Sequence, residues 1–180
     1  MPYSIGSHFP SFSLQACVST EAGKEFSLMN QEILRGAWSV IFFYPLDFTF
    51  VCPTEIIEFS KHMENFREKN AKVYGVSGDS HYSHLAWRTT HPDLKNLEYP
   101  LLADYSRELS GQLGILHLEE KVPLRATYIV EPDLSIRWIC LNDLKVGRSV
   151  QEVLRVLDAL QTNELCPCDW NRGQATLKAV

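Results

Sequence analysis

The sequence lacks several features that mark common functional classes. It has no apolar run long enough to span a bilayer. It has no basic block either, since 17 Lys and Arg and 22 Asp and Glu residues are spread along the chain and give a formal charge of -5, so no nucleic acid partner is expected. The first residues, MPYSIGSHFPSFSL, have neither the charged leader nor the apolar core of a signal peptide. We expect a soluble cytoplasmic protein with no membrane association.

Metal-site and disulfide-framework signatures are also scarce. The six histidines form no His-Glu-x-x-His arrangement, and we expect His81 and His84 to be surface or loop residues. Five cysteines are an odd number, in a chain of 180 residues that can build its own core, so structural disulfides explain them poorly. Cys166 and Cys168 have no second cysteine pair or spaced histidines nearby, which makes a zinc site the weaker alternative for them. Redox chemistry is the stronger one.

The remaining pattern alternates strands with helices. Residues 39–44 and 72–77 are apolar and β-rich, as in strands buried on both faces. Between them, apolar residues recur at helical spacing from Cys52 to about Lys69. Strand, helix and strand together predict a parallel βαβ crossover.

The later part of the chain predicts an antiparallel addition to this sheet. RATYIVEPDLSIRWICL reads as two strands joined by a turn at residues 132–133. Ser149 and Glu152 form a capping box for a last helix that ends near Gln161. We therefore predict a three-layer α/β domain with a mixed central sheet over residues 1–161, followed by an extended C-terminal arm over residues 162–180, which shows no helix or strand period.

Cys52 occupies the most informative position. It follows a buried strand and precedes Pro53, a residue suited to the first turn of a helix. Unpaired amides and the positive end of the helix dipole favour thiolate over thiol there. A small buried cysteine that merely packs would be the alternative.

The residues around Cys52 favour the reactive interpretation. PLDFTFVCPTE places Pro45, Thr49 and Cys52 in a P-x-x-x-T-x-x-C arrangement that resembles the active-site motif of peroxiredoxins. The resemblance implies that Cys52 attacks a hydroperoxide, that the Thr49 hydroxyl binds the thiolate and the peroxide, and that Pro45 shields the sulfur from water. It also implies a thioredoxin-like fold.

Two charged residues resemble further parts of this family site. Arg125, in PLRATYIVEPD, resembles the arginine that stabilises the thiolate and the leaving oxygen, although a solvated surface charge is its alternative. Glu55 resembles the acidic residue that orients this arginine, with a plain first-turn helix carboxylate as the alternative.

The tail resembles the resolving segment of typical two-cysteine peroxiredoxins. ELCPCDW places Cys166 in the resolving position, and Cys168 resembles the second cysteine of the alkyl hydroperoxide reductase C branch. Cys168 could substitute for Cys166, relay the disulfide to a reductant, or be a spectator. In this class the resolving cysteine comes from the other subunit of a dimer.

The resemblance as a whole implies a thiol-dependent peroxidase that reduces hydrogen peroxide and organic hydroperoxides through a sulfenic acid and an intersubunit disulfide. It implies no metal or other cofactor, a dithiol reductant protein of the thioredoxin or flavoprotein reductase kind, and a homodimer that assembles into a ring. A thioredoxin-like disulfide oxidoreductase is disfavoured because position 55 is Glu and not a partner cysteine. A redox-regulated chaperone or sensor scaffold is the alternative from another class.

Overall fold

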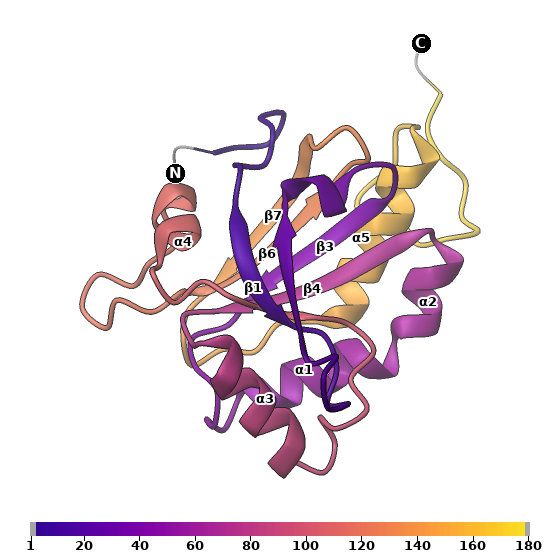
Figure 1. The fold of residues 1–180 in the computed structure, drawn as a ribbon. Helices are drawn as coiled ribbons and strands as arrows, with labels where there is room; N and C mark the ends of the chain where they lie inside the picture. The colour runs from indigo at the N-terminus through magenta and orange to yellow at the C-terminus, as the bar shows by residue number, and fades with distance from the viewer. Residues whose placement is uncertain (1–2, 179–180) are drawn as a thin grey trace. The chain divides into compact units, whose positions relative to one another are not determined.

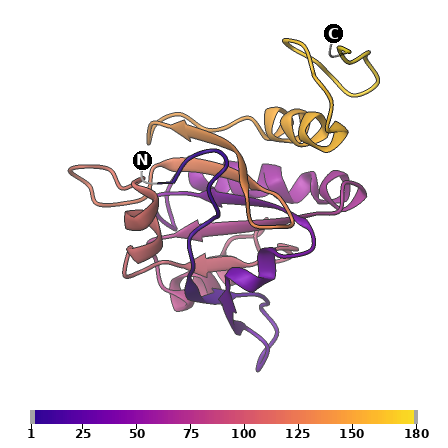
Figure 2. The ribbon, with the colours of Figure 1, turned by 90° about the horizontal axis from the view of Figure 1, so that it is seen from above.

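The computed structural model describes residues 3–178 and divides into two compact units, Met1–Arg148 and Ser149–Val180. The first unit is built on a seven-stranded sheet of order β2-β1-β5-β4-β3-β6-β7 (Figure 1). Figure 2 shows this succession by colour, from orange β7 at one edge to the indigo strands at the other. Its strands are β1 (Ser13–Cys17), β2 (Phe26–Asn30), β3 (Trp38–Phe43), β4 (Ala71–Ser77), β5 (Leu101–Ala103), β6 (Arg125–Val130) and β7 (Ile136–Asn142).

The sheet is mixed, as the sequence predicts. Strands β3, β4 and β5 run parallel, whereas β6 pairs antiparallel with both β3 and β7, and β1 pairs antiparallel with β2 and β5. The predicted βαβ crossover is therefore confirmed as β3, the following helices and β4. The predicted antiparallel pair is confirmed as β6 and β7.

Helices of the first unit are η1 (Gln31–Leu34), α1 (Cys52–Lys61), α2 (Met63–Glu68), α3 (His81–Thr90) and α4 (Glu108–Leu113). The single helix expected from Cys52 to Lys69 is wrong in one respect, since it breaks at His62. The His62 amide donates to the Phe59 carbonyl oxygen at 3.1 Å, which closes α1 with a tight turn before α2 begins.

The expectation that His84 lies on the surface or in a loop is also wrong, because His84 is fully buried in helix α3, which the sequence reasoning did not predict. His81, the first residue of the same helix, is half-buried. A buried imidazole needs hydrogen-bond partners, and His84 finds them in Asp47 and the Leu102 carbonyl, which lie far from it in sequence.

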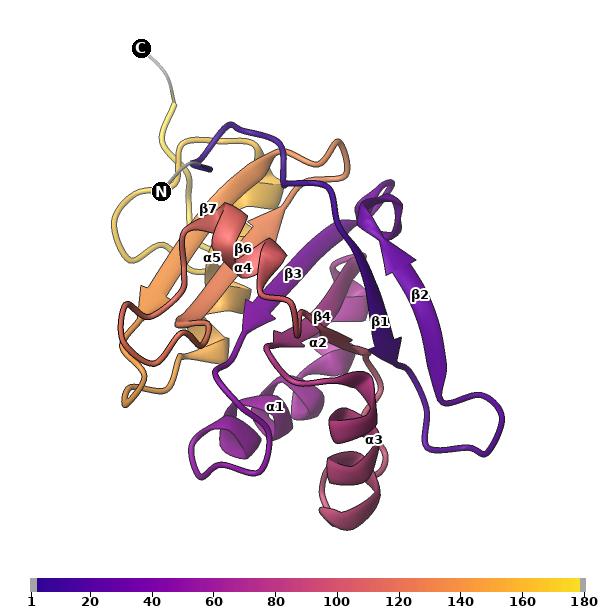
Figure 3. The same ribbon diagram turned by 60° about the vertical axis from the view of Figure 1, so that its left-hand side comes forward.

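Helices cover both faces of the sheet because the β3 side chains alternate between two apolar layers. Phe42 stacks on Phe59 of α1 with ring centroids 4.3 Å apart. Ile41 and Phe43 point the other way, into a core cluster that includes Leu109 of α4. Figure 3 shows α4 in front of the sheet and α1 and α2 behind it. The first unit is therefore a three-layer α/β structure.

The second unit consists of helix α5 (Val150–Thr162) and the tail that follows. The Ser149 side chain accepts a hydrogen bond from the Glu152 amide at 3.2 Å, so the predicted cap is confirmed. Arg155 donates to the Trp170 carbonyl oxygen at 2.9 Å, which ties the tail to its own helix. The unit begins before α5, whereas the predicted arm begins after it. Across the described residues, no helix has both the length and the apolar character needed to cross a membrane.

Candidate active site

Cys52 is the first residue of α1, in the turn that leads from β3 into this helix. Pro53 occupies the first helical turn, and no side chain caps the helix at Val51. No side-chain acceptor therefore competes for the positive end of the helix dipole, which lies at Cys52. Cys52 is fully buried, so water screens this field little.

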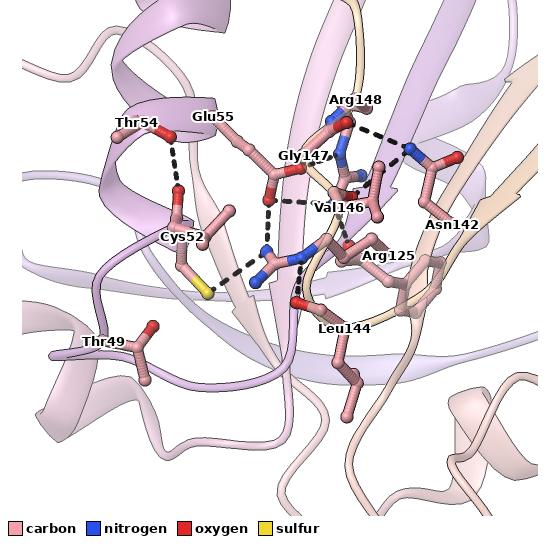
Figure 4. Close-up of polar contacts among 12 residues, drawn as sticks. Thr49, Cys52, Thr54, Glu55, Arg125, Asn142, Leu144, Val146, Gly147 and Arg148 are labelled. Atoms are coloured by element: carbon pink, nitrogen blue, oxygen red, sulfur yellow. Dashed lines mark hydrogen bonds and ion pairs between the residues drawn. The ribbon is translucent and has the colours of Figure 1, made fainter.

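Arg125 reaches Cys52 because of the sheet topology. It is the first residue of β6, and β6 pairs antiparallel with β3 so that Thr127 lies opposite Phe42. The start of β6 therefore lies at the end of β3, where the chain turns toward Cys52. Figure 4 shows Arg125 Nη1 directed at the Cys52 sulfur, 3.4 Å away, while Arg125 Nε donates to the Leu144 carbonyl oxygen at 2.8 Å. A permanent cation thus faces the sulfur with its orientation fixed by a second hydrogen bond.

Glu55 lies one helical turn after Cys52 and is buried between two arginines. Its Oε2 accepts from Arg125 Nη1 at 2.5 Å, and its Oε1 accepts from the amide and the Nε of Arg148 at 3.0 and 2.8 Å. The predicted contact between Glu55 and Arg125 is present. The two guanidinium groups and the one carboxylate together carry a net charge of about +1, which a Cys52 thiolate would neutralise.

Arg148 is a site residue that the sequence reasoning missed. Its guanidinium also donates to the carbonyl oxygens of Phe43 at 2.6 Å and Ala126 at 2.9 Å, so it joins the ends of β3 and β6 to Glu55. An arginine just before a helix-capping serine carries no local signal of burial. The one available indication was that a buried Glu55 carboxylate, once paired with Arg125, still has lone pairs that a second cation could bind.

Pro45 and Thr49 lie in the turn before Cys52, where Pro45 is buried and Thr49 is half-buried. The Thr49 hydroxyl donates to the Leu46 carbonyl oxygen at 2.9 Å (Figure 4). The structure thus joins Cys52, Arg125 and Glu55 by direct contacts. It brings Pro45 and Thr49 into the same turn without a hydrogen bond from Thr49 to the sulfur among the contacts described.

The tail cysteines lie in the second unit and differ in exposure. Cys166 is half-buried, with its sulfur 3.5 Å from the Thr162 hydroxyl and 3.7 Å from the Ala159 carbonyl oxygen, whereas Cys168 is exposed. Within the described part of the chain, no group of three or more His, Cys, Asp or Glu residues is placed to hold a metal ion.

Cys17 shows what a buried cysteine looks like without such a site. It lies at the end of β1, and burial raises the pKa of its thiol even though Arg88 works in the opposite direction. Arg88 Nη1 is 3.9 Å from this sulfur and is itself held by the Cys17 carbonyl oxygen. Cys17 therefore remains a neutral, inaccessible thiol.

The chain is similar to several known proteins. The sequence model of the AhpC/TSA family matches residues 5–139. Alkyl hydroperoxide reductase C of Mycolicibacterium smegmatis is 44% identical over 183 residues, which cover 97% of this chain and 93% of the relative. The mitochondrial thioredoxin-dependent peroxide reductase of Drosophila melanogaster is 46% identical over 164 residues, with coverages of 85% and 69%. The reduced 2-Cys peroxiredoxin of Plasmodium vivax has a TM-score of 0.91 at 34% identity and covers 98% of this chain and 94% of its own.

Proposed function

Because the chain belongs to the AhpC/TSA family of peroxiredoxins and has their thioredoxin-like fold, we propose that it is a thiol-dependent peroxidase with Cys52 as the nucleophile. The observation that carries this assignment is the Arg125 guanidinium, 3.4 Å from the Cys52 sulfur and held in place by Glu55. The substrates are hydrogen peroxide and organic hydroperoxides. The reaction needs no metal or other cofactor.

The first step is a displacement at oxygen. The Cys52 thiolate attacks the nearer oxygen of the hydroperoxide, so an S–O bond forms while the O–O bond breaks and the departing oxygen leaves as water or alcohol after taking up a proton. Arg125 stabilises the negative charge that moves from sulfur to the leaving oxygen. Cys52 is oxidised to a sulfenic acid.

Pro45 and Thr49 prepare the substrate's position. Because the Thr49 hydroxyl donates its hydrogen bond to the Leu46 carbonyl oxygen, its own oxygen can accept a hydrogen bond from the O–H group of the hydroperoxide. The buried Pro45 keeps bulk water from the sulfur, which strengthens the electrostatic effect of Arg125. Glu55 and Arg148 act as positioning residues, because Glu55 holds Arg125 and Arg148 holds Glu55, and neither contacts the sulfur among the described interactions.

The second step closes a disulfide. The thiol of Cys166 from the other subunit of a homodimer condenses with the Cys52 sulfenic acid, which forms an S–S bond and releases water. Cys168, the exposed thiol two residues on, is an accessory thiol able to receive this disulfide. A dithiol protein of the thioredoxin or flavoprotein reductase kind then returns both cysteines to thiols. The dimers assemble into a ring, and the protein works in the cytoplasm, where such reductants keep thiols reduced.

Stopped-flow mixing of the reduced protein with hydrogen peroxide, followed by tryptophan fluorescence, tests this assignment. Wild type is compared with Cys52→Ser, Cys166→Ser and Cys168→Ser, and non-reducing gels are run on the products. We expect the fast phase to be lost only in Cys52→Ser and the dimer-linked disulfide to be lost in Cys166→Ser. The Cys168→Ser variant is the matched control, and it should keep both. A wild-type protein without a Cys52-dependent phase would favour the chaperone or sensor scaffold.

A further inference from the structure

A buried carboxylate lies in the middle of the turn that carries the proposed peroxide-binding residues. Asp47 is between Pro45 and Thr49, and its side chain is almost wholly inaccessible. One oxygen accepts from the Tyr44 hydroxyl at 2.9 Å, and the other accepts from the Ser83 hydroxyl at 3.0 Å. This carboxylate takes part in none of the contacts of Cys52, Arg125 or Glu55 described above.

The third partner of Asp47 is His84 of helix α3, whose Nδ1 lies 2.7 Å from Asp47 Oδ2. The other ring nitrogen, Nε2, lies 3.2 Å from the Leu102 carbonyl oxygen, a group that can only accept. The Tyr44 hydroxyl remains a donor to Asp47, because burial and the charge of Asp47 raise the pKa of Tyr44 well above its usual value and keep the phenol protonated. His84 therefore lies between two oxygens, one from the Asp47 carboxyl group and one from the Leu102 main chain, and links the turn to α3 and β5.

The backbone of Asp47 is anchored separately. Its amide donates to Asp79 Oδ2 at 2.7 Å, and the same oxygen accepts from the Ser77 hydroxyl at 3.0 Å at the end of β4. Asp47 is thus fixed through its side chain to α3 and through its main chain to the end of β4. Apolar packing contributes less, since the neighbouring Leu46 and Phe48 are 37% and 58% exposed.

We propose that the buried contact between Asp47 and His84 is a positioning element for the peroxidase reaction, which holds the turn so that Pro45 and Thr49 face Cys52. The inference rests on the proposed function of Cys52. A displacement of about 1 Å in a substrate-positioning group costs on the order of 10²-fold in rate, so polar anchors on this turn control the peroxide reaction. Among the described contacts, none of these anchors touches Cys52 or Arg125, so we expect the reactivity of the Cys52 sulfur toward other reagents to be unchanged.

The test separates peroxide reactivity from general thiol reactivity. The full-length reduced protein is reacted with hydrogen peroxide and, separately, with iodoacetamide, which needs the Cys52 thiolate and not the peroxide-binding turn; mass spectrometry identifies the alkylated cysteine. In Asp47→Asn we expect the peroxide rate to fall about tenfold or more while the alkylation rate of Cys52 changes by less than about threefold.

Tyr44→Phe is the milder variant, which deletes one oxygen and keeps the turn's charges. We expect it to lower the peroxide rate about threefold to tenfold. Tyr74→Phe is its matched control, because it deletes a tyrosine hydroxyl that donates to the Ile33 carbonyl and should leave the rate unchanged. The inference is overturned if both variants react with peroxide like wild type, or if the peroxide and alkylation rates fall equally. A wild type with no Cys52-dependent reaction would instead remove the proposed function itself.

Discussion

Replacing Arg125 with glutamine removes the cation that lies 3.4 Å from the Cys52 sulfur. Glu55 keeps its hydrogen bonds from the amide and the Nε of Arg148, so no buried charge is left without a partner. We therefore expect the free energy of unfolding to fall by only about 1.5–3 kcal/mol, the order of a lost hydrogen bond to a charged group. The rate of peroxide reduction should fall about 10²–10³-fold, which corresponds to about 3–4 kcal/mol of barrier.

The matched control is Glu55→Gln, which changes the shape of the side chain little but removes the negative charge between the two arginines. Here Arg125 and Arg148 stay buried without a carboxylate, and removing one partner of such a group costs about 3–5 kcal/mol of stability. Urea unfolding of the reduced proteins measures the free energy of unfolding, and stopped-flow fluorescence with excess hydrogen peroxide measures the rate of peroxide reduction. An Arg125→Gln protein that reduces peroxide within about threefold of the wild-type rate would refute the electrostatic role of Arg125.

Three further perturbations follow from local features. Gly75→Ala should lower the free energy of unfolding by about 1–3 kcal/mol in urea titrations, because its Cβ would lie 2.7 Å from a Leu101 methyl carbon and 3.0 Å from the Phe42 ring; an unchanged midpoint would contradict this. Burial raises the pKa of Asp79, so its contribution to stability is fully present below the usual value of 3.8 and is lost as the pH rises through the folded-state pKa. Asp79→Asn should therefore flatten the plot of unfolding free energy against pH in that window. Parallel plots for the variant and the wild type would contradict this. Ser149→Ala removes the cap of α5 and should cost about 1 kcal/mol, seen as faster amide hydrogen exchange in the first turn, while equal exchange rates would show that the cap contributes nothing.

The parts of the fold that follow local patterns could be predicted from the sequence. The helix that begins at Cys52 has apolar residues at helical spacing and a proline in its first turn, and β6 and β7 flank a clear turn signal. Strand β5 could not be found this way, because three residues carry no period and their conformation is set by pairing with β4 and β1.

The candidate site divides in a similar manner. Cys52, Thr49 and Pro45 lie within eight residues of one another in a motif, so their proximity is a local property. Arg148 and His84 were missed because their burial depends on partners that are distant in the chain, Glu55 for Arg148 and Asp47 for His84. Patterns of hydrophobicity report which residues leave water, but they do not report which polar groups meet once the sheet has formed.

The contact between Arg125 and Cys52 joins residues separated by 73 positions in the chain. During synthesis at 5–20 residues per second, the cysteine is made about 4 to 15 s before the arginine that faces it. Until strand β6 takes its place beside β3, Cys52 has no Arg125 guanidinium next to it. The cation that faces the sulfur is therefore supplied by the assembled sheet and not by the segment that carries the cysteine.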